Sequence, residues 1–455
     1  MKIFGSSGVR GVANEELTPA FVGRVAMAAG SVFASREGPT RVALGRDTRA
    51  TGEMFADGAA AGLASVGCDV DRVGVLPTPA LQAYAAREGV PALMITASHN
   101  PPQYNGVKLV GRDGVELARD ALERVEDRLL AERFATVSWD ATGVTRRIEG
   151  AKRAYVGEVL AAVDRDRIAE AGLIVALDPG HGAGALTSPT LFEALGCHVV
   201  TVNSQPDGRF PGRDPEPIAE NLADLRRLVR ASDADVGIAH DGDADRAIFV
   251  DETGEHVEGD AALAALAAAE LADGDTTVSA VNVSQRLVDV ANEVGADLEL
   301  TPIGSTNIIT RIRALEQADV TVPVAGEGNG GVLFPDFRLG RDGAYTAARF
   351  CELLADRRAS EIAAAHSGYY NVRVNVEYED DGEREALLGA AEAAARESDA
   401  ELDVTDGHRL DYGDAWVLVR PSGTEPVVRI YAEARTPERA NELARDMHDV
   451  LLAAA

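Results

Sequence analysis

Short apolar runs that pass directly into polar loops recur along most of the chain. PALMI (91–95) leads into TASHNP (96–101), GIAH (237–240) into DGDADR (241–246), and TVPVA (321–325) into GEGNGG (326–331). Helix-like patterns separate these runs, and this alternation builds α/β units. Because α/β proteins place their chemistry where strands end, we predict three related α/β units, each carrying one functional loop.

Local signals place individual elements in the first unit. Thr18 precedes Pro19, the pairing of an N-cap with a proline at the first helical position, and predicts a helix to about residue 36. Apolar runs predict strands at 41–45 and 69–75, and Gly67 is expected to end the helix between them.

The chain is too long for one hydrophobic core. Its 455 residues exceed the roughly 250–300 residues that a single core spans. After about residue 368 the pattern changes to alternating strands, with a terminal helix from about residue 436, which predicts a smaller α+β domain. We therefore expect four domains, at residues 1–148, 149–251, 252–367 and 368–455.

Acidic residues dominate the charge and are spread along the whole sequence. The chain has 74 Asp and Glu against 44 Lys and Arg, a net charge of −30, and only three of the basic residues are lysine. This balance argues against nucleic-acid or anionic-membrane partners. It favours a protein kept hydrated at very high salt, as in a halophilic archaeon, over an ordinary acidic cytosolic enzyme.

Cysteine usage and the N-terminal sequence indicate a compartment. Cys68, Cys197 and Cys351 are odd in number and far apart, so they indicate neither a disulfide framework nor a zinc cluster. No apolar signal-peptide core follows Met1, and Glu270 interrupts an alanine-rich run that is too short for a membrane span. We expect a cytoplasmic protein.

The loop DGDADR places three carboxylates at alternate positions. Asp241, Asp243 and Asp245 can surround one hard divalent cation with oxygen ligands, and without a cation they would repel one another. An EF-hand is disfavoured because its sixth position would be Arg246 instead of glycine. An ordinary acidic turn is the remaining alternative, and the apolar strands on both sides argue against it.

Two further loops offer groups that recognise a sugar phosphate. RPSGTEP (420–426) contains hydroxyls, free backbone N–H groups and a guanidinium that can hold a phosphate dianion, although a plain hairpin would look similar. In GEGNGG, four glycines surround Glu327 and Asn329, which suits hydroxyl recognition or, alternatively, a flexible linker.

TASHNP places a hydroxyl beside an imidazole at the end of a strand. Ser98 and His99 could form a hydrolase nucleophile and base, but the G-x-S-x-G elbow of such enzymes is missing. A serine that carries phosphate would instead need a metal and a fixed ammonium, which the aspartate loop and Lys108 can provide.

Taken together and in this order, TASHNP, DGDADR, the GEGNGG loop and RPSGTEP resemble the α-D-phosphohexomutase family, which includes phosphoglucomutases, phosphomannomutases and phosphoglucosamine mutases. The resemblance extends over the whole chain, with FGSSGVRG (4–11), GRDTR (45–49), LPTP (76–79) and DGRFPGRDPEP (207–217) as further motifs. It implies three related α/β domains with mixed sheets and a smaller α+β fourth domain, a mobile lid, around a central cleft.

The resemblance also implies roles for single residues. Ser98 would be the phosphoserine and, with Asp241, Asp243 and Asp245, would bind one Mg²⁺ per chain. The groups around the transferring phosphoryl would be Arg10, His99, Lys108 and Arg246, with Lys108 near proton transfer because arginine is effectively never deprotonated. Sugar and phosphate would be bound by Gly304, Glu327, Asn329, Arg420, Ser422, Gly423, Thr424 and Arg429.

The implied reaction moves a phosphoryl group between O6 and O1 of a hexose phosphate through a hexose 1,6-bisphosphate intermediate, which also serves as activator. Many relatives close the sugar loop with a histidine, whereas this chain has Gly331, as in the archaeal branch of the family. FGSSGVRG and GEGNGG favour glucosamine 6-phosphate as substrate, and mixed phosphomannomutase/phosphoglucomutase specificity is the alternative.

Two other classes of function are weighed against the mutase. A phosphosugar hydrolase would need no phosphate loop such as RPSGTEP, and a non-catalytic sugar-phosphate sensor would tolerate the loss of Ser98 or of an aspartate. We expect a hexose phosphate as the small-molecule partner, with the chain a monomer or homodimer.

Overall fold

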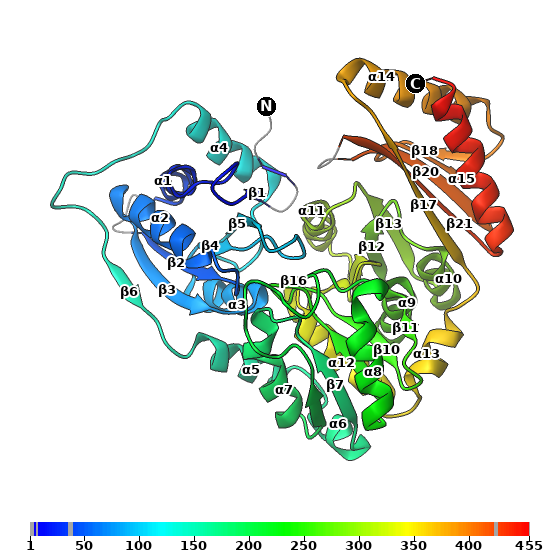
Figure 1. Cartoon of the computed structure of the whole chain (residues 1–455), viewed down its shortest axis with the longest axis horizontal. Helices are drawn as coiled ribbons and strands as arrows, with labels where there is room; N and C mark the ends of the chain where they lie inside the picture. The colour runs from blue at the N-terminus through cyan, green and yellow to red at the C-terminus, as the bar shows by residue number, and fades with distance from the viewer. Residues whose placement is uncertain (1–3, 6–7, 35–39, 423–425, 455) are drawn as a thin grey trace. The chain divides into compact units, whose positions relative to one another are not determined.

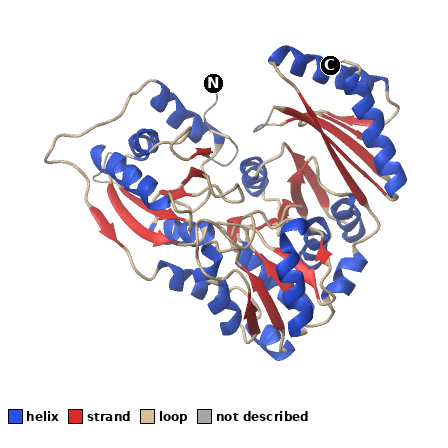
Figure 2. Ribbon diagram, viewed as in Figure 1, coloured by secondary structure: helices blue, strands red, loops and turns tan. Residues whose placement is uncertain are grey.

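The computed structural model describes residues 4–5, 8–34, 40–422 and 426–454 (Figure 1). Gly423 and Thr424 of the expected phosphate loop therefore lie outside the described residues. Contacts group the chain into two compact units, Met1–Ala262 with Asn329–Ala363 and Leu263–Gly328 with Ala364–Ala455. Figure 2 shows helices and strands alternating along most of the chain, as the sequence predicts.

The first sheet of unit 1 has the strand order β1-β5-β4-β2-β3-β6. Its strands are β1 (Val9–Val12), β2 (Arg41–Arg46), β3 (Asp69–Val75), β4 (Ala92–Ile95), β5 (Tyr104–Val110) and β6 (Thr145–Arg147). β4, β2, β3 and β6 run parallel, whereas β5 pairs antiparallel with β4 and with β1. The sheet is therefore mixed, as predicted.

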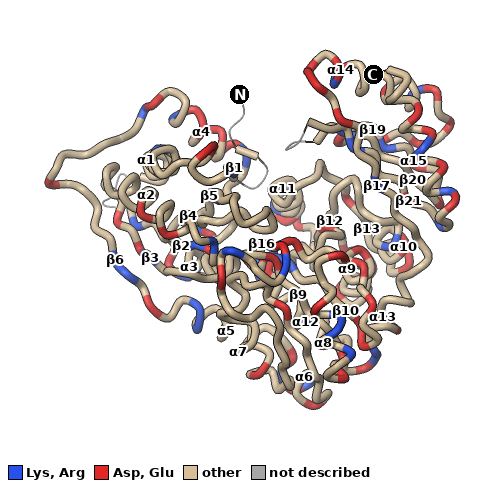
Figure 3. The backbone as a smooth tube through the Cα atoms, in the orientation of Figure 1, with Lys and Arg blue, Asp and Glu red and all other residues tan. Residues whose placement is uncertain are grey.

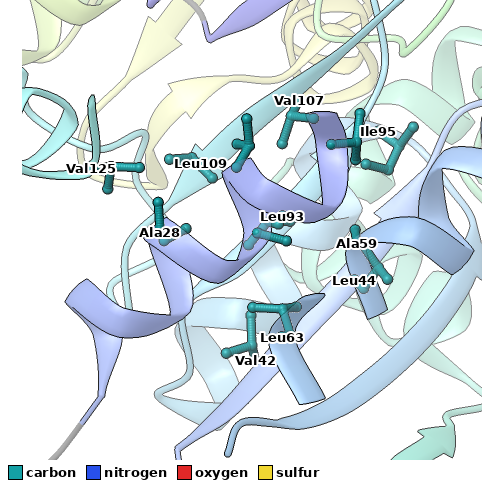
Figure 4. Close-up of a cluster of buried hydrophobic side chains, with 14 of the residues drawn as sticks. Ala28, Val42, Leu44, Ala59, Leu63, Leu93, Ile95, Val107, Leu109 and Val125 are labelled. Atoms are coloured by element: carbon teal, nitrogen blue, oxygen red, sulfur yellow. The ribbon is translucent and has the colours of Figure 1, made fainter. Parts of the chain in front are cut away.

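Helices cover this sheet and bury its central strands. α1 (Pro19–Phe33) packs against α2 (Gly52–Ser65) and α4 (Arg119–Leu130), and α3 (Thr78–Glu88) packs against β2 and β4. Figure 4 shows strand residues such as Leu93 and Val107 meeting Ala28, Leu63 and Val125 from the helices. Every residue of β4 is buried, which explains the uninterrupted apolar run that leads into TASHNP.

The second sheet of unit 1 repeats this pattern, with the order β11-β10-β9-β7-β8. Its strands are β7 (Ile174–Asp178), β8 (His198–Thr201), β9 (Val236–Ala239), β10 (Ile248–Asp251) and β11 (His256–Val257). β8, β7 and β9 run parallel, and β10 is antiparallel to β9. The first sheet has the same arrangement, in which β3, β2 and β4 run parallel and β5 is antiparallel to β4. The accompanying helices are α5 (Ala151–Ala161), α6 (Arg165–Ala171), α7 (Ser188–Ala194) and α8 (Ala223–Ser232).

The third α/β segment contributes strands to both units. In unit 2, β12 (Thr276–Ala280) pairs in parallel with β13 (Asp297–Thr301) and β14 (Ala325–Glu327). In unit 1, β15 (Gly331–Phe334) pairs antiparallel with β16 (Arg338–Arg341). The helices of this segment are α9 (Gly259–Glu270), α10 (Gln285–Val294), α11 (Ser305–Glu316), α12 (Gly343–Leu354) and α13 (Ala359–Ala365).

The last sheet belongs to unit 2 and is antiparallel throughout, in the order β17-β21-β20-β19-β18. Its strands are β17 (Tyr370–Glu377), β18 (Glu401–Asp403), β19 (His408–Asp411), β20 (Ala415–Pro421) and β21 (Val427–Ala434). α14 (Asp381–Glu397) and α15 (Pro437–Leu452) supply residues such as Leu387 and Leu443 to the core beneath it. This is the α+β segment that the alternating strand pattern predicts.

Local signals located the start of α1 better than its end. The Thr18 side chain accepts a hydrogen bond from the Phe21 backbone N–H at 3.2 Å, so the predicted N-cap of α1 is confirmed, but the helix ends at Phe33 instead of residue 36.

The three cysteines are buried free thiols. Among the described residues, no helix combines the length and apolar composition needed to cross a membrane.

Candidate active site

Two of the predicted functional loops occupy the same place in the two sheets of unit 1. Residues 96–103 connect β4 to β5, and residues 240–247 connect β9 to β10, in each case joining two antiparallel neighbours. The two loops meet: a Cβ atom added at Gly242 would lie 2.6 Å from the Ser98 carbonyl oxygen. The Ser98 hydroxyl donates a hydrogen bond to Asp241 Oδ2 at 2.6 Å.

Ser98 adopts a backbone conformation that is unusual for a residue with a side chain. Its φ of 52° is left-handed, and the surrounding contacts hold it there. The Ser98 N–H donates to Thr96 Oγ1 at 2.9 Å, and the Thr96 hydroxyl donates to Asp47 Oδ2 at 2.6 Å. Thr96, Ser98 and Asp47 are all buried, so the loop is fixed from beneath.

The fully buried Arg49, of the GRDTR motif, clamps the same loop. Its guanidinium donates to the carbonyl oxygens of Ser98, Asn100, Pro101 and Tyr104 at 2.6–2.9 Å. Its Nε also donates to Asp47 Oδ2 at 3.1 Å. No functional role was predicted for Arg49, because its partners are backbone oxygens that no side-chain pattern marks.

The predicted metal residues form a buried cluster. One ligand atom from each of Asp241, Asp243 and Asp245 lies within 4.8 Å of the others. Each of these side chains has one oxygen, Oδ1, that accepts no hydrogen bond from any described residue. Carboxylate oxygens that accept no hydrogen bond, clustered in this way, suit a hard cation such as Mg²⁺, so the residues present fit the expected metal. Burial, together with the charges of Asp245 and Asp243, raises the pKa of Asp241 to about 7.

Lys108, on β5, extends to this cluster. Its ammonium donates to Asp243 Oδ2 at 2.8 Å and to Asp245 Oδ2 at 3.0 Å. Burial alone would lower the pKa of Lys108, but the two carboxylates outweigh it and raise that pKa above the usual value. The two carboxylates therefore favour the charged form of the ammonium.

Arginines surround the serine loop on its remaining sides. Arg10, on β1, donates to Asn100 Oδ1 at 2.8 Å, and Arg246 Nη2 lies 3.1 Å from His99 Nδ1. Because guanidinium only donates, Nδ1 of His99 must accept, which places the imidazole proton on Nε2. Burial, with Arg246 and Arg10, holds the pKa of His99 far below its usual range, so the ring is neutral.

Unit 1 also contains two cluster contacts that the sequence did not predict. Thr78, from the LPTP motif, donates its hydroxyl to Asp243 Oδ2 at 2.5 Å, and Arg341, on β16, donates to Asp245 Oδ2 at 2.7 Å. The LPTP motif signalled the family but gave Thr78 no role. Asn329 of the predicted sugar loop accepts a hydrogen bond from the Gly331 N–H at 3.0 Å.

The remaining predicted residues lie in unit 2. Gly304, with a φ of 123°, precedes α11, and the neighbouring Ile303 N–H donates to Asp406 Oδ2 at 3.0 Å. Asp406 also forms an ion pair of 3.1 Å with Arg420, which joins the Gly304 loop to the end of β20. Glu327 ends β14 and is buried. Arg420 and Arg429 are direct cross-strand partners, and the Ser422 N–H donates to the Val427 carbonyl oxygen at 2.8 Å.

Family models of four successive domains match the chain. The descriptions are phosphoglucomutase/phosphomannomutase alpha/beta/alpha domain I at residues 1–136, domain II at 153–254, domain III at 256–370, and the C-terminal domain at 371–450. The predicted fold class is thereby confirmed.

Individual relatives agree along almost the whole chain. The phosphoglucomutase/phosphomannomutase of Thermococcus kodakarensis is 42% identical over 451 residues, which cover 97% of this chain and 96% of that protein. The probable phosphoglucosamine mutase of Methanopyrus kandleri is 40% identical over 457 residues, covering 99% and 98%. A solved phosphoglucomutase/phosphomannomutase family protein from Burkholderia thailandensis superposes with a TM-score of 0.87 at 29% identity, covering 99% and 97%. The chain therefore belongs to the phosphoglucomutase/phosphomannomutase family of phosphohexomutases, which are isomerases.

Proposed function

We propose that this enzyme interconverts the 6-phosphate and 1-phosphate of a hexose through a phosphoserine at Ser98 and a hexose 1,6-bisphosphate. The observation that carries the proposal is the buried contact between the Ser98 hydroxyl and Asp241, 2.6 Å long, in a cluster where three carboxylate oxygens accept no hydrogen bond from the described residues. The phosphohexomutase names of the relatives support a mutase over a hydrolase or a sensor.

The first transfer takes a phosphoryl group from Ser98 Oγ to the free sugar hydroxyl. The Oγ–P bond breaks, the sugar O–P bond forms, and the hydroxyl proton passes in net terms to Ser98 Oγ. The bisphosphate then turns around, and its other phosphate returns to Ser98 while the proton returns to the sugar oxygen. Because this transition state is loose, positioning and electrostatic stabilisation supply most of the catalysis.

Residues of this chain meet those requirements in unit 1. Arg10 and Arg246 provide positive charge beside the serine loop, and neutral His99 keeps Nε2 as a hydrogen-bond donor. Lys108 holds Asp243 and Asp245. Asp241, Asp243 and Asp245 would hold one Mg²⁺, with the phosphate on Ser98 as a further ligand; when bound, the ion supplies positive charge that stabilises the transferring phosphoryl oxygens.

The phosphate that does not react is assigned to unit 2. Arg420 and Arg429 lie directly opposite each other on β20 and β21. Like charges at opposed cross-strand positions repel, and Arg420 also forms an ion pair with Asp406. A phosphate dianion bound between the two guanidiniums would remove the repulsion, and Ser422, Gly423 and Thr424 would supply the remaining donors.

Glucosamine 6-phosphate is the proposed preferred substrate, with Gly304, Glu327 and Asn329 recognising the sugar. The relatives carry both phosphoglucosamine mutase and phosphoglucomutase/phosphomannomutase names, so mixed mannose and glucose specificity remains the second candidate. Values of kcat/KM for glucosamine 6-phosphate, mannose 6-phosphate and glucose 1-phosphate separate the two. A 100-fold preference for glucosamine corresponds to about 2.7 kcal/mol of transition-state discrimination.

Replacing the serine tests the mechanism directly. With labelled hexose 1,6-bisphosphate, the wild-type chain should take up one phosphoryl group, whereas Ser98→Ala should take up none and lose mutase activity. Ser65→Ala is the matched control, because the Ser65 hydroxyl donates within α2 to the Gly62 carbonyl oxygen at 2.7 Å. Label and turnover retained in Ser98→Ala would overturn the proposal; sustained release of inorganic phosphate would favour a hydrolase, and binding without turnover a sensor.

A further inference from the structure

The three aspartates of the cluster share one arrangement. Oδ2 of each side chain accepts hydrogen bonds from neighbours, and Oδ1 accepts none from the described residues. Asp241 Oδ2 is held by Ser98, Asp243 Oδ2 by Thr78 and Lys108, and Asp245 Oδ2 by Lys108 and Arg341. Fixing one oxygen of a carboxylate also fixes the direction of the other.

Thr78 holds Asp243 at two points. Its backbone N–H donates to the Asp243 carbonyl oxygen at 2.9 Å, while its hydroxyl donates to Oδ2 at 2.5 Å. Thr78 is the first residue of α3 and is buried, as Asp243 is. The two bonds therefore set both the backbone position and the side-chain rotamer of this aspartate.

Arg341 reaches Asp245 through space that Gly331 leaves open. A Cβ atom at position 331 would lie 2.6 Å from Arg341 Cδ and 3.0 Å from Asn329 Oδ1. Arg341 is buried, and its Nη2 donates to Asp245 Oδ2 at 2.7 Å. Arg341 can therefore reach the cluster only because residue 331 is a glycine without a side chain.

We propose that Thr78 and Arg341 are positioning residues of the cation site, which aim Oδ1 of Asp243 and Asp245 toward the point that Oδ1 of Asp241 also faces. The inference rests on the proposed binding of a divalent cation by these aspartates. Groups that orient metal ligands in this way typically change metal affinity by about 10–100-fold when they are removed.

The test uses variants that keep the net charge of the protein. Removing a positively charged side chain from the site would by itself strengthen metal binding and hide the effect of positioning. Thr78→Val removes a hydroxyl and keeps the shape of the side chain. Gly331→Ala adds the Cβ that displaces Arg341, and Arg341→Lys shortens the side chain and removes its fork. Thr78→Ser keeps the hydroxyl donor and should therefore bind the metal with near wild-type affinity.

Binding of Mn²⁺ and Mg²⁺ to the full unphosphorylated chain is measured by titration calorimetry, with no substrate present. We expect about 10–100-fold weaker binding in Thr78→Val, Gly331→Ala and Arg341→Lys. Thr40→Val and Gly157→Ala are the matched controls: the Thr40 hydroxyl donates to the Phe33 carbonyl oxygen at 3.5 Å, and a Cβ at Gly157 would meet nothing within 4 Å. Thermal unfolding checks that each variant is folded.

The outcomes separate this inference from the proposed function. Wild-type metal affinity in folded Thr78→Val would overturn the positioning role of Thr78. Wild-type metal affinity in both folded Gly331→Ala and folded Arg341→Lys would overturn that of Arg341. In either case the proposed cation site itself would stand. Absence of binding by the wild-type chain overturns the cation site and the inference together.

Discussion

Lys108 shows how a buried environment determines what a side chain can do. Its ammonium lies between Asp243 and Asp245, and the two carboxylates raise its pKa against the opposing effect of burial. An ammonium is a compact point charge, whereas a guanidinium is wide and planar, so an arginine at position 108 would require the two carboxylates to move. The scarcity of lysine elsewhere in the chain is consistent with a specific requirement here.

Lys108→Arg should lower kcat by at least about tenfold, because the larger guanidinium would displace the aspartates from the arrangement that holds the phosphoryl group. Lys152→Arg is the matched control: Lys152 is only partly buried, and its ammonium donates to the Val75 carbonyl oxygen at 3.1 Å. Steady-state kinetics on both variants measures the effect. Near-normal turnover in Lys108→Arg would show that the spacing of this contact does not matter for catalysis.

At the scale of elements, the loop between β4 and β5 is held mainly by β2. Asp47 and Arg49 follow β2 directly, and together they contact the Thr96 side chain and four backbone oxygens of the loop. β2 and β4 are parallel neighbours in register, so their carboxyl ends lie side by side. The left-handed Ser98 is thus supported by sheet geometry together with one buried ion pair.

Arg49→Met should reduce the free energy of unfolding by about 3–5 kcal/mol, because it leaves the Asp47 carboxylate buried without its ion-pair partner. Arg46→Met should cost no more than about 1 kcal/mol, since Arg46 pairs with the exposed Glu53. Urea unfolding at constant KCl measures both values. Equal losses of unfolding free energy in the two variants would contradict the role of Arg49 in holding the loop.

At the scale of the whole molecule, charge is the dominant feature. Acidic residues are spread along the chain in both units (Figure 3), and many of the ion pairs involve exposed partners. A net charge of −30 makes the folded chain repel itself, and salt screens that repulsion. The Debye length falls from about 10 Å at 0.1 M to about 3 Å at 1 M, so screening is nearly complete in molar salt.

The melting temperature should therefore rise as KCl increases from 0.1 M to 2 M, with most of the gain below about 1 M. Sucrose is the control, because it stabilises the folded state by exclusion from the protein surface without screening charge. Differential scanning calorimetry follows both series. A melting temperature that does not depend on KCl would make the prediction of a high-salt protein wrong.

The sequence by itself determined the elements and the family. Strand–loop alternation predicted the α/β units, Thr18 and Pro19 predicted the start of α1, and the change of pattern after about residue 368 predicted a smaller α+β domain. These features are local, because apolar periodicity and capping act within a few residues. Asp241, Asp243 and Asp245 were recognised as a cluster for the same reason: their spacing alone brings them close together.

Only the tertiary structure decided which distant groups complete the site. Thr78 lies 165 residues from Asp243 in sequence, Arg341 lies 96 residues from Asp245, and Arg49 reaches the Ser98 carbonyl across 49 residues. Such contacts depend on strand order, register and the space left by neighbours such as Gly331, none of which a local pattern contains. Short motifs identify the residue types of the site. The orientation of its carboxylates depends on packing between elements that come together only when the chain folds.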